Sequence, residues 1–160
     1  MIIRQLLLGL SLAGAVPLAF AQSSTTTTAT RSYQFQPIGL GSTETASINV
    51  YNSASDAKSG TASSCTGSIS FMNGSGTAIG GATSFTLTSG QVFSATLPFS
   101  GSGGSGVRTI VIGSVSATFT SGTPCNLSMS LETYDTASGA THVELAGPAA
   151  GNGGVGPNGR

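Results

Sequence analysis

The sequence predicts an all-β protein: a single antiparallel, immunoglobulin-like β-sandwich of about seven or eight strands with one disulfide. Three observations support this prediction. Apolar residues alternate with polar ones over short segments, which is the pattern of half-buried strands. Gly-rich turns separate these segments, and no segment is long and periodic enough to form a helix. Binary pattern and turn spacing therefore agree on the fold class.

The chain opens with an export signal at residues 1–21. Arg4 supplies the positive charge, the run from Leu6 to Leu18 supplies a short apolar stretch, and Ala19 and Ala21 are the small residues that a signal peptidase reads. We expect the mature chain to begin at Gln22 and to be secreted or periplasmic. The apolar run is too short for a stable membrane span, so we expect no stable membrane insertion.

Three segments follow the signal. Residues 22–31, rich in Thr and Ser, have no apolar period and predict a flexible leader, and residues 147–160, rich in Gly, Pro and Asn, predict a disordered tail. Residues 32–146 form the predicted sandwich domain. Their number is ordinary for one domain and sufficient for one hydrophobic core.

Seven segments show clean alternation, and each predicts a strand with one apolar face. In chain order, the apolar positions are Tyr33 and Phe35; Ala46, Ile48 and Val50; Ile69 and Phe71; Phe85 and Leu87; Phe93, Ala95 and Leu97; Leu127, Met129 and Leu131; and Val143 and Leu145.

A further strand, 108–119, changes phase. Its first apolar residues, Ile110 and Ile112, occupy even positions, whereas its last ones, including Val115 and Phe119, occupy odd positions. Because a slip of one residue inverts the faces of a strand, we expect a β-bulge at Gly113. The alternative is that the strand crosses from one sheet to the other there.

The two cysteines, Cys65 and Cys125, predict a structural disulfide. Each lies in phase with the apolar face at the start of its strand, and two cysteines allow one intramolecular pairing. An exported chain meets an oxidising compartment, where such bonds persist. A widely separated pair has neither the CxxC spacing of a redox site nor the ligand number of a zinc site.

The charge balance limits the partners. Once Arg4 is removed with the signal, the four remaining basic residues face five acidic ones, and the net charge is about one negative. No basic cluster could neutralise phosphates, so we expect no nucleic-acid binding. So few charges also favour self-association, and the partner that we expect is an unidentified protein or glycan.

The final hairpin carries the densest polar cluster. Pairing Thr133 with Val143 would place Glu132 opposite Glu144, and Tyr134 opposite His142, on the outward face. Two carboxylates beside a histidine could hold a weakly bound cation such as calcium. The alternatives are an exposed polar face without a ligand and neutralisation of the carboxylates by Arg108. We predict no catalytic residue, no dedicated metal site and no cofactor.

Three sites match glycosylation patterns. Asn73 and Asn126 each begin an Asn-x-Ser sequence, and the run Thr25 to Thr28 resembles an O-glycosylated spacer. Such matches are frequent in a chain rich in Ser and Thr. Whether any of them is modified is left open.

The arrangement of turns and core positions resembles small exported immunoglobulin-like proteins of uncharacterised function from environmental bacteria. The resemblance covers most of residues 33–145. The residues that carry it are Gly39-Leu40, Glu44 to Ala46, Ile48 to Val50, Asn52, Cys65, Leu87, Gly90-Gln91, Arg108, Cys125, Tyr134-Asp135, Gly139 and Thr141. It implies a fold and no activity, and the chain has no tryptophan to pack on the disulfide as in true immunoglobulin domains.

These observations favour a secreted, non-catalytic module with a structural, adhesion or binding role at the cell envelope or outside the cell. A pilin-like subunit that exchanges strands is the first alternative, with Tyr33 and Phe35 as the apolar positions of a short donor strand. A carbohydrate-active enzyme is the second and weaker alternative. It would need two carboxylates that flank a cleft, whereas we expect Glu132 and Glu144 to be adjacent on a flat face.

Overall fold

The computed structural model describes residues 26–56, 60–147 and 150–151, and most of them belong to β-strands. The strands are β1 (Thr28–Gln34), β2 (Ile38–Gly41), β3 (Glu44–Asn52), β4 (Ser64–Asn73), β5 (Ala78–Thr88), β6 (Val92–Pro98), β7 (Arg108–Thr120), β8 (Asn126–Asp135), β9 (Thr141–Ala146) and β10 (Ala150–Gly151). The single helical element among the described residues is a 3-10 turn, η1 (Phe99–Gly101). The prediction of an all-β fold is therefore confirmed.

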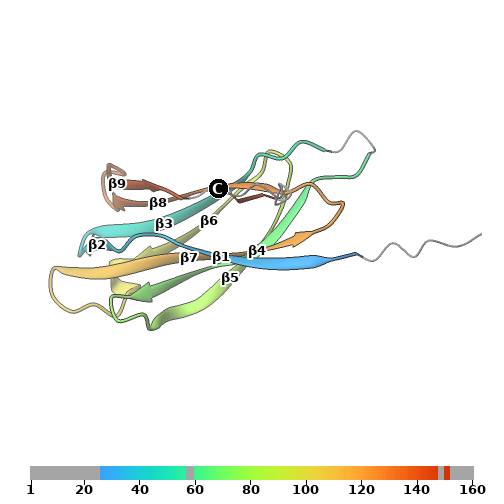
Figure 1. Ribbon diagram of the computed structural model, residues 1–160. Helices are drawn as coiled ribbons and strands as arrows, with labels where there is room; N and C mark the ends of the chain where they lie inside the picture. Colours follow the sequence, from blue (N-terminus) through green and yellow to red (C-terminus); the bar gives the residue numbers. More distant parts are fainter. Residues whose placement is uncertain (1–25, 57–59, 148–149, 152–160) are drawn as a thin grey trace, which may run out of the picture.

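The strands form two antiparallel sheets that pack face to face as a β-sandwich (Figure 1). Sheet A has the order β1-β7-β4-β5, and β2 pairs with β7 on the same side as β1. Sheet B has the order β10-β8-β3-β6, and β9 pairs with β8 on the same side as β10. The strand order alternates between distant parts of the chain, so most pairings are long-range.

The eight strands predicted from alternation are all present, and the two additional ones are short. β2 pairs four residues with β7, and β10 pairs two residues with β8. At four and two residues both segments are too short for alternation to predict a strand, although Ile38 and Leu40 of β2 are buried. Main-chain pairing with a neighbour defines them, and that pairing leaves no signature in the local sequence.

The predicted leader is partly wrong. Residues 28–31 belong to β1, which pairs with β7 from Thr28↔Thr120 to Gln34↔Ser114. The composition of this strand is polar because most of its side chains are exposed, and hydrogen bonding to β7 rather than burial holds it in place. Two residues of the predicted tail likewise form β10. The signal peptide, residues 22–25 and, within the tail, residues 148–149 and 152–160 lie outside the described residues.

The core lies between the sheets and contains the apolar positions that alternation predicts. Strands β3 and β8 supply its centre, where Ile48 pairs with Leu131 and both are fully buried. Sheet A contributes Ile69, Val115 and Phe85 from the opposite side. Tyr33 and Phe93 pack against this core while remaining partly exposed.

The predicted bulge at Gly113 is wrong, and β7 does not cross between sheets. Its register with β4 runs without interruption from Thr66↔Thr118 to Asn73↔Val111. The buried residues keep the odd phase throughout, with Gly113 among them, so Ile110 and Ile112 face outward. A Cβ at Gly113 would lie 2.7 Å from Ile48 Cδ1, so any side chain there would force Ile48 to move. Glycine therefore interrupts the apolar pattern where Ile48 from the opposite sheet fills the space of a side chain.

The disulfide forms as predicted between Cys65 and Cys125, whose Cα atoms are 5.2 Å apart. It joins β4 of sheet A to the start of β8 in sheet B, and both cysteines are buried. Such bonds are typical of proteins in oxidising compartments. None of the described segments forms a helix with the length and hydropathy of a membrane span.

Candidate functional site

The final hairpin adopts only part of its predicted register. Glu132 lies opposite Glu144, and Thr133 lies opposite Val143, as predicted. The next pair is different, because Tyr134 lies opposite Thr141 and the register is irregular there. The predicted pairing of Tyr134 with His142 is therefore wrong, and His142 is the extra residue of a β-bulge.

The turn of this hairpin accounts for the shift. The Asp135 carboxylate accepts hydrogen bonds from the Ala137 and Ser138 amides at 3.1 and 2.8 Å, and the Ser138 hydroxyl adds a third at 2.9 Å. Gly139 completes the turn with a φ of 71°. This turn is one residue shorter than a regular ladder would leave, and the bulge takes up the spare residue.

The bulge directs His142 toward a residue from another strand. Its Nδ1 atom lies 2.5 Å from Glu44 Oε1, close enough for a hydrogen-bonded ion pair when the imidazole is protonated. The other carboxylate oxygen of Glu44 accepts a hydrogen bond from the Gly41 amide at 2.6 Å. This amide, together with His142 and the more distant charge of Arg108, lowers the pKa of Glu44 below its ordinary value.

The remaining members of the predicted cluster have other surroundings. Glu132 accepts a hydrogen bond at 2.9 Å from the side-chain amide of Asn49 on β3, whereas Glu144 is exposed on the edge strand β9. The charge of Arg108 contributes to the lowered pKa of Glu44. No three His, Cys, Asp or Glu residues in the described part of the chain lie close enough together to hold a metal ion.

An open cleft of about 490 Å³ lies at the end of the sandwich that carries Glu44. Three connecting segments surround it: the turn between β2 and β3, the end of β6 with η1, and the turn between β8 and β9. The lining residues are Ser42, Thr43, Glu44, Pro98, Phe99, Ser100, Asp135, Thr136 and Ala137. The cleft thus combines an apolar wall, several hydroxyl groups and two carboxylates.

Register brings the two carboxylates of the cleft together. Glu44 begins β3 and Asp135 ends β8, and the two residues are direct cross-strand partners. Hydrogen bonds from the Ser138 amide and hydroxyl lower the pKa of Asp135 as well. Both groups are therefore negatively charged at neutral pH, which makes the cleft attractive to neutral or cationic ligands and unfavourable for anions.

Sequence analysis did not identify Glu44, Phe99 or Asp135 as residues of a binding site. In the structure Phe99 is partly buried against the core while it also lines the cleft. The two carboxylates stand 91 positions apart in the sequence and meet only because β3 and β8 are neighbours. The sole local signal was that each occurs beside a predicted turn.

Two of the glycosylation candidates lie in turns or at strand starts. The Asn73 side-chain oxygen accepts hydrogen bonds from the amides of Ser75 and Thr77 in the β4–β5 turn. Asn126 donates a hydrogen bond to the Ser53 hydroxyl at 2.9 Å. Thr28 opens β1, and Thr25 lies outside the described residues.

Comparison with known proteins found no relative of this chain. No family model, no curated protein and no solved structure matches this chain. The resemblance to small exported immunoglobulin-like proteins therefore stays a prediction, and the function rests on the geometry of the molecule alone.

Proposed function

We propose that this chain is a secreted, non-catalytic β-sandwich module that binds a partner at the cell envelope or outside the cell, through the cleft bounded by Glu44, Phe99 and Asp135. The observation that supports this proposal is the convergence of three connecting segments around one open cavity on a rigid two-sheet scaffold. Loops held by a scaffold are where binding sites concentrate in such folds.

The lining of the cleft favours a glycan as the partner. Sugars present an apolar face and a ring of hydroxyls, and Phe99 with Pro98 offers an apolar surface beside hydroxyls that donate and accept hydrogen bonds. The charged oxygens of Glu44 and Asp135 strengthen hydrogen bonds from ligand hydroxyls. Fixed carboxylates also disfavour anionic sugars.

The electrostatics of the cleft favour binding over catalysis. Glycoside hydrolysis uses one carboxyl group with a raised pKa as the general acid and a second as base or nucleophile. Glu44 and Asp135 both have lowered pKa values, so neither holds a proton at neutral pH. Glu132 and Glu144 are cross-strand partners on a sheet face and do not line this cleft. The carbohydrate-active enzyme is therefore the weaker alternative.

The test is a binding screen with a variant that fills the cleft. Ala137 lines the cleft and is exposed, so Ala137→Trp should block it without disturbing the core. Ala140→Trp is the matched control, since Ala140 is exposed on the same turn but outside the cleft. We expect the mature chain and the Ala140→Trp variant to bind neutral oligosaccharides. The Ala137→Trp variant should not bind them. Equal binding by both variants would contradict the proposal.

A strand-exchanging structural subunit is the second candidate, and β1 is the observation that favours it. This N-terminal strand lies at the edge of sheet A, and six of its seven side chains are exposed. Its attachment rests on pairing with β7, which a second copy could provide equally well. Light scattering with size-exclusion chromatography over a range of concentrations distinguishes the candidates, because exchange produces a ladder of species and a discrete module stays monomeric.

A further inference from the structure

The outward face of sheet A carries hydroxyl side chains that stand in register across four strands. One row consists of threonines from β1, β7, β4 and β5, and the adjacent row consists of serines from the same strands. The residues are Thr30, Thr118, Thr66 and Thr86 in the first row, and Ser32, Ser116, Ser68 and Ser84 in the second. We call these eight residues the hydroxyl face.

Alternation with the core shows that the hydroxyl face points outward. On β7, the residues between and beside its two members are Val115, Ala117 and Phe119, and all three are buried. Ser68, Ser116 and Thr118 on the central strands are half-buried, whereas Thr66 and the four members on the edge strands β1 and β5 are exposed. The array therefore lies on the side of sheet A away from sheet B, and Figure 1 shows how the two sheets are layered.

Strand geometry makes this array a regular lattice. Neighbouring strands lie about 4.8 Å apart, and alternate residues along a strand repeat at about 6.7 Å. Within the threonine row, the hydroxyls of Thr30 and Thr118 lie 3.3 Å apart and share a hydrogen bond. Each hydroxyl can donate one hydrogen bond and accept two. A water molecule likewise both donates and accepts hydrogen bonds.

The chemistry of the hydroxyl face limits the kinds of partner that it can bind. None of its eight members is charged, so it complements a neutral partner and not a polyanion or a cation. None is aromatic, so it has neither the stacking surface that binds sugars nor the anchor residues of protein interfaces. A neutral lattice of water molecules that both donate and accept hydrogen bonds has the matching charge and the matching hydrogen-bonding character.

We propose that the hydroxyl face binds ice. Oxygen atoms on the prism faces of hexagonal ice repeat at two distances that are similar in size to those between the hydroxyls of a pleated sheet. Neighbouring strands rotate by about 20–25° relative to one another, so the match is best over β7 and the two strands that flank it. Thr118, which lies between Thr30 and Thr66, is the centre of the proposed site.

The experiment measures thermal hysteresis and inhibition of ice recrystallisation with the oxidised mature chain, residues 22–160. Thr118→Tyr places a bulky ring in the middle of the hydroxyl face. If this variant does not fold, Thr86→Tyr places the same ring on the edge strand β5. Thr96→Tyr is the matched control, because Thr96 is an exposed threonine on the outer face of sheet B. Melting temperatures confirm that each variant is folded.

We expect the wild-type chain and Thr96→Tyr to shape ice crystals and to slow their growth equally. Both effects should fall several-fold in Thr118→Tyr and less in Thr86→Tyr. A folded wild-type chain with neither hysteresis nor recrystallisation inhibition would overturn the proposal, and so would equal activity in Thr118→Tyr. A third outcome would also overturn the proposal: the wild-type chain forms dimers that Thr118→Tyr dissociates, and neither protein affects ice growth. That outcome would assign the hydroxyl face to self-association.

Discussion

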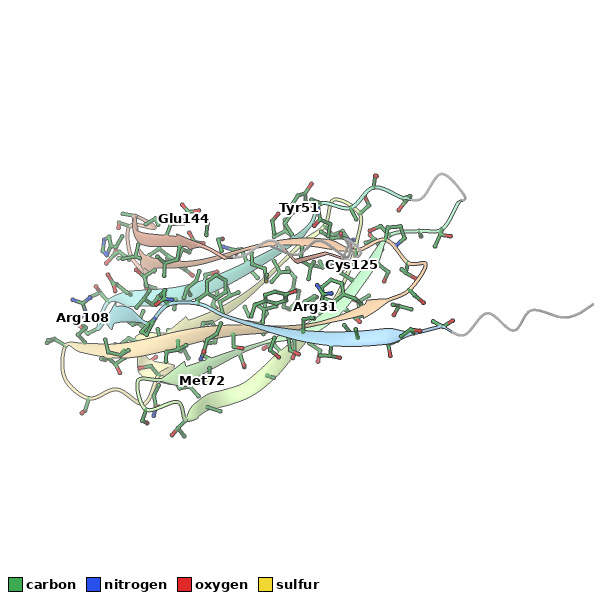
Figure 2. The ribbon with its side chains drawn as sticks, in the orientation of Figure 1. Arg31, Tyr51, Met72, Arg108, Cys125 and Glu144 are labelled. Carbon is green, nitrogen blue, oxygen red and sulfur yellow. A yellow bond between two sulfur atoms is a disulfide. The ribbon has the colours of Figure 1, made fainter. Side chains whose placement is uncertain are left out.

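At one end of the sandwich a disulfide and a buried polar network tie the two sheets together, whereas at the other end three connecting segments surround an open cleft. Cys125 and Glu144 mark these two ends in Figure 2. Strands β3 and β8 run between the ends: Asn52 and Asn126 lie beside the disulfide, and Glu44 and Asp135 lie at the cleft. The contrast shows how a small sandwich can separate the residues that hold it together from those that face a partner.

The polar network of the closed end centres on Asn52, which is fully buried. Its side-chain nitrogen donates hydrogen bonds to the Ser63 hydroxyl at 2.8 Å and to the Leu87 carbonyl at 3.2 Å. Its side-chain oxygen accepts one from the Ala54 amide at 3.1 Å. Since Leu87 belongs to sheet A and Asn52 to sheet B, this one side chain links the sheets next to the disulfide.

The largest expected effect comes from opening the closed end. Replacing both Cys65 and Cys125 by Ala removes a cross-link between residues 60 positions apart, which costs about 4 kcal/mol on the chain-entropy model. Urea denaturation of the double variant and of the oxidised wild type measures this difference. Reduced wild type serves as the control and should match the variant; an unchanged midpoint would contradict the stabilising role of this end.

A smaller loss is expected from Asn52→Ala. The change leaves the buried Ser63 hydroxyl and the Leu87 carbonyl without their partner, which costs about 2–3 kcal/mol of unfolding free energy. Asn126→Ala is the control, because its amide bonds to Ser53 in an exposed position and should cost about 0.5 kcal/mol. Equal losses in the two variants would show that burial of Asn52 is not what matters.

The cleft end should instead respond to acid. Because folding lowers the pKa of Glu44, the unfolded chain takes up its proton at a higher pH than the folded chain does. The stability from Glu44 is therefore complete above its ordinary pKa of 4.5 and is lost as the pH falls through the lower folded value. Asp135 contributes in the same direction.

Melting temperatures measured from neutral pH to pH 3 test this expectation. We expect Glu44→Gln to be less stable than wild type at neutral pH and to lose less stability in acid. Glu144→Gln changes an exposed carboxylate on the edge strand and should keep the acid response of wild type. A Glu44→Gln curve parallel to that of wild type would contradict the assignment.

The smallest effect is expected from calcium. Glu132 already bonds to Asn49, and His142 to Glu44, so the groups once expected to share a cation face different partners. Titration with calcium should leave the melting temperature unchanged, with magnesium as the control. A rise that saturates with calcium alone would restore the cation site predicted from the hairpin sequence.

Much of the fold was predictable because alternation is a local property. The core phases of β3, β5, β6 and β8 follow directly from their sequences, and Cys65 had a single partner available. Prediction failed where a neighbour overrode the local pattern. Gly113 interrupts the apolar phase of β7 because Ile48 from the other sheet occupies the space of a side chain. Thr28 to Arg31 looked flexible because pairing with β7 is invisible in a polar segment.

The candidate site was less predictable for the same reason. The pairing of Glu132 with Glu144 was predicted from the residue spacing within one hairpin, and the structure confirms it. The position of His142 depends on a bulge that the Asp135 turn imposes, and its contact with Glu44 depends on β3 lying beside β8. A contact between distant strands requires knowledge of strand order, which no local pattern contains.

By itself, the sequence determined the fold class, most strands, the disulfide and the hydroxyl-rich composition of the strands in sheet A. Only the tertiary structure decided which strands are neighbours, and with them the cleft around Glu44 and Asp135 and the alignment of threonine with threonine across sheet A. The physical reason is range: side-chain alternation and turn chemistry act over a few residues, whereas register between strands is set by packing across the whole sandwich.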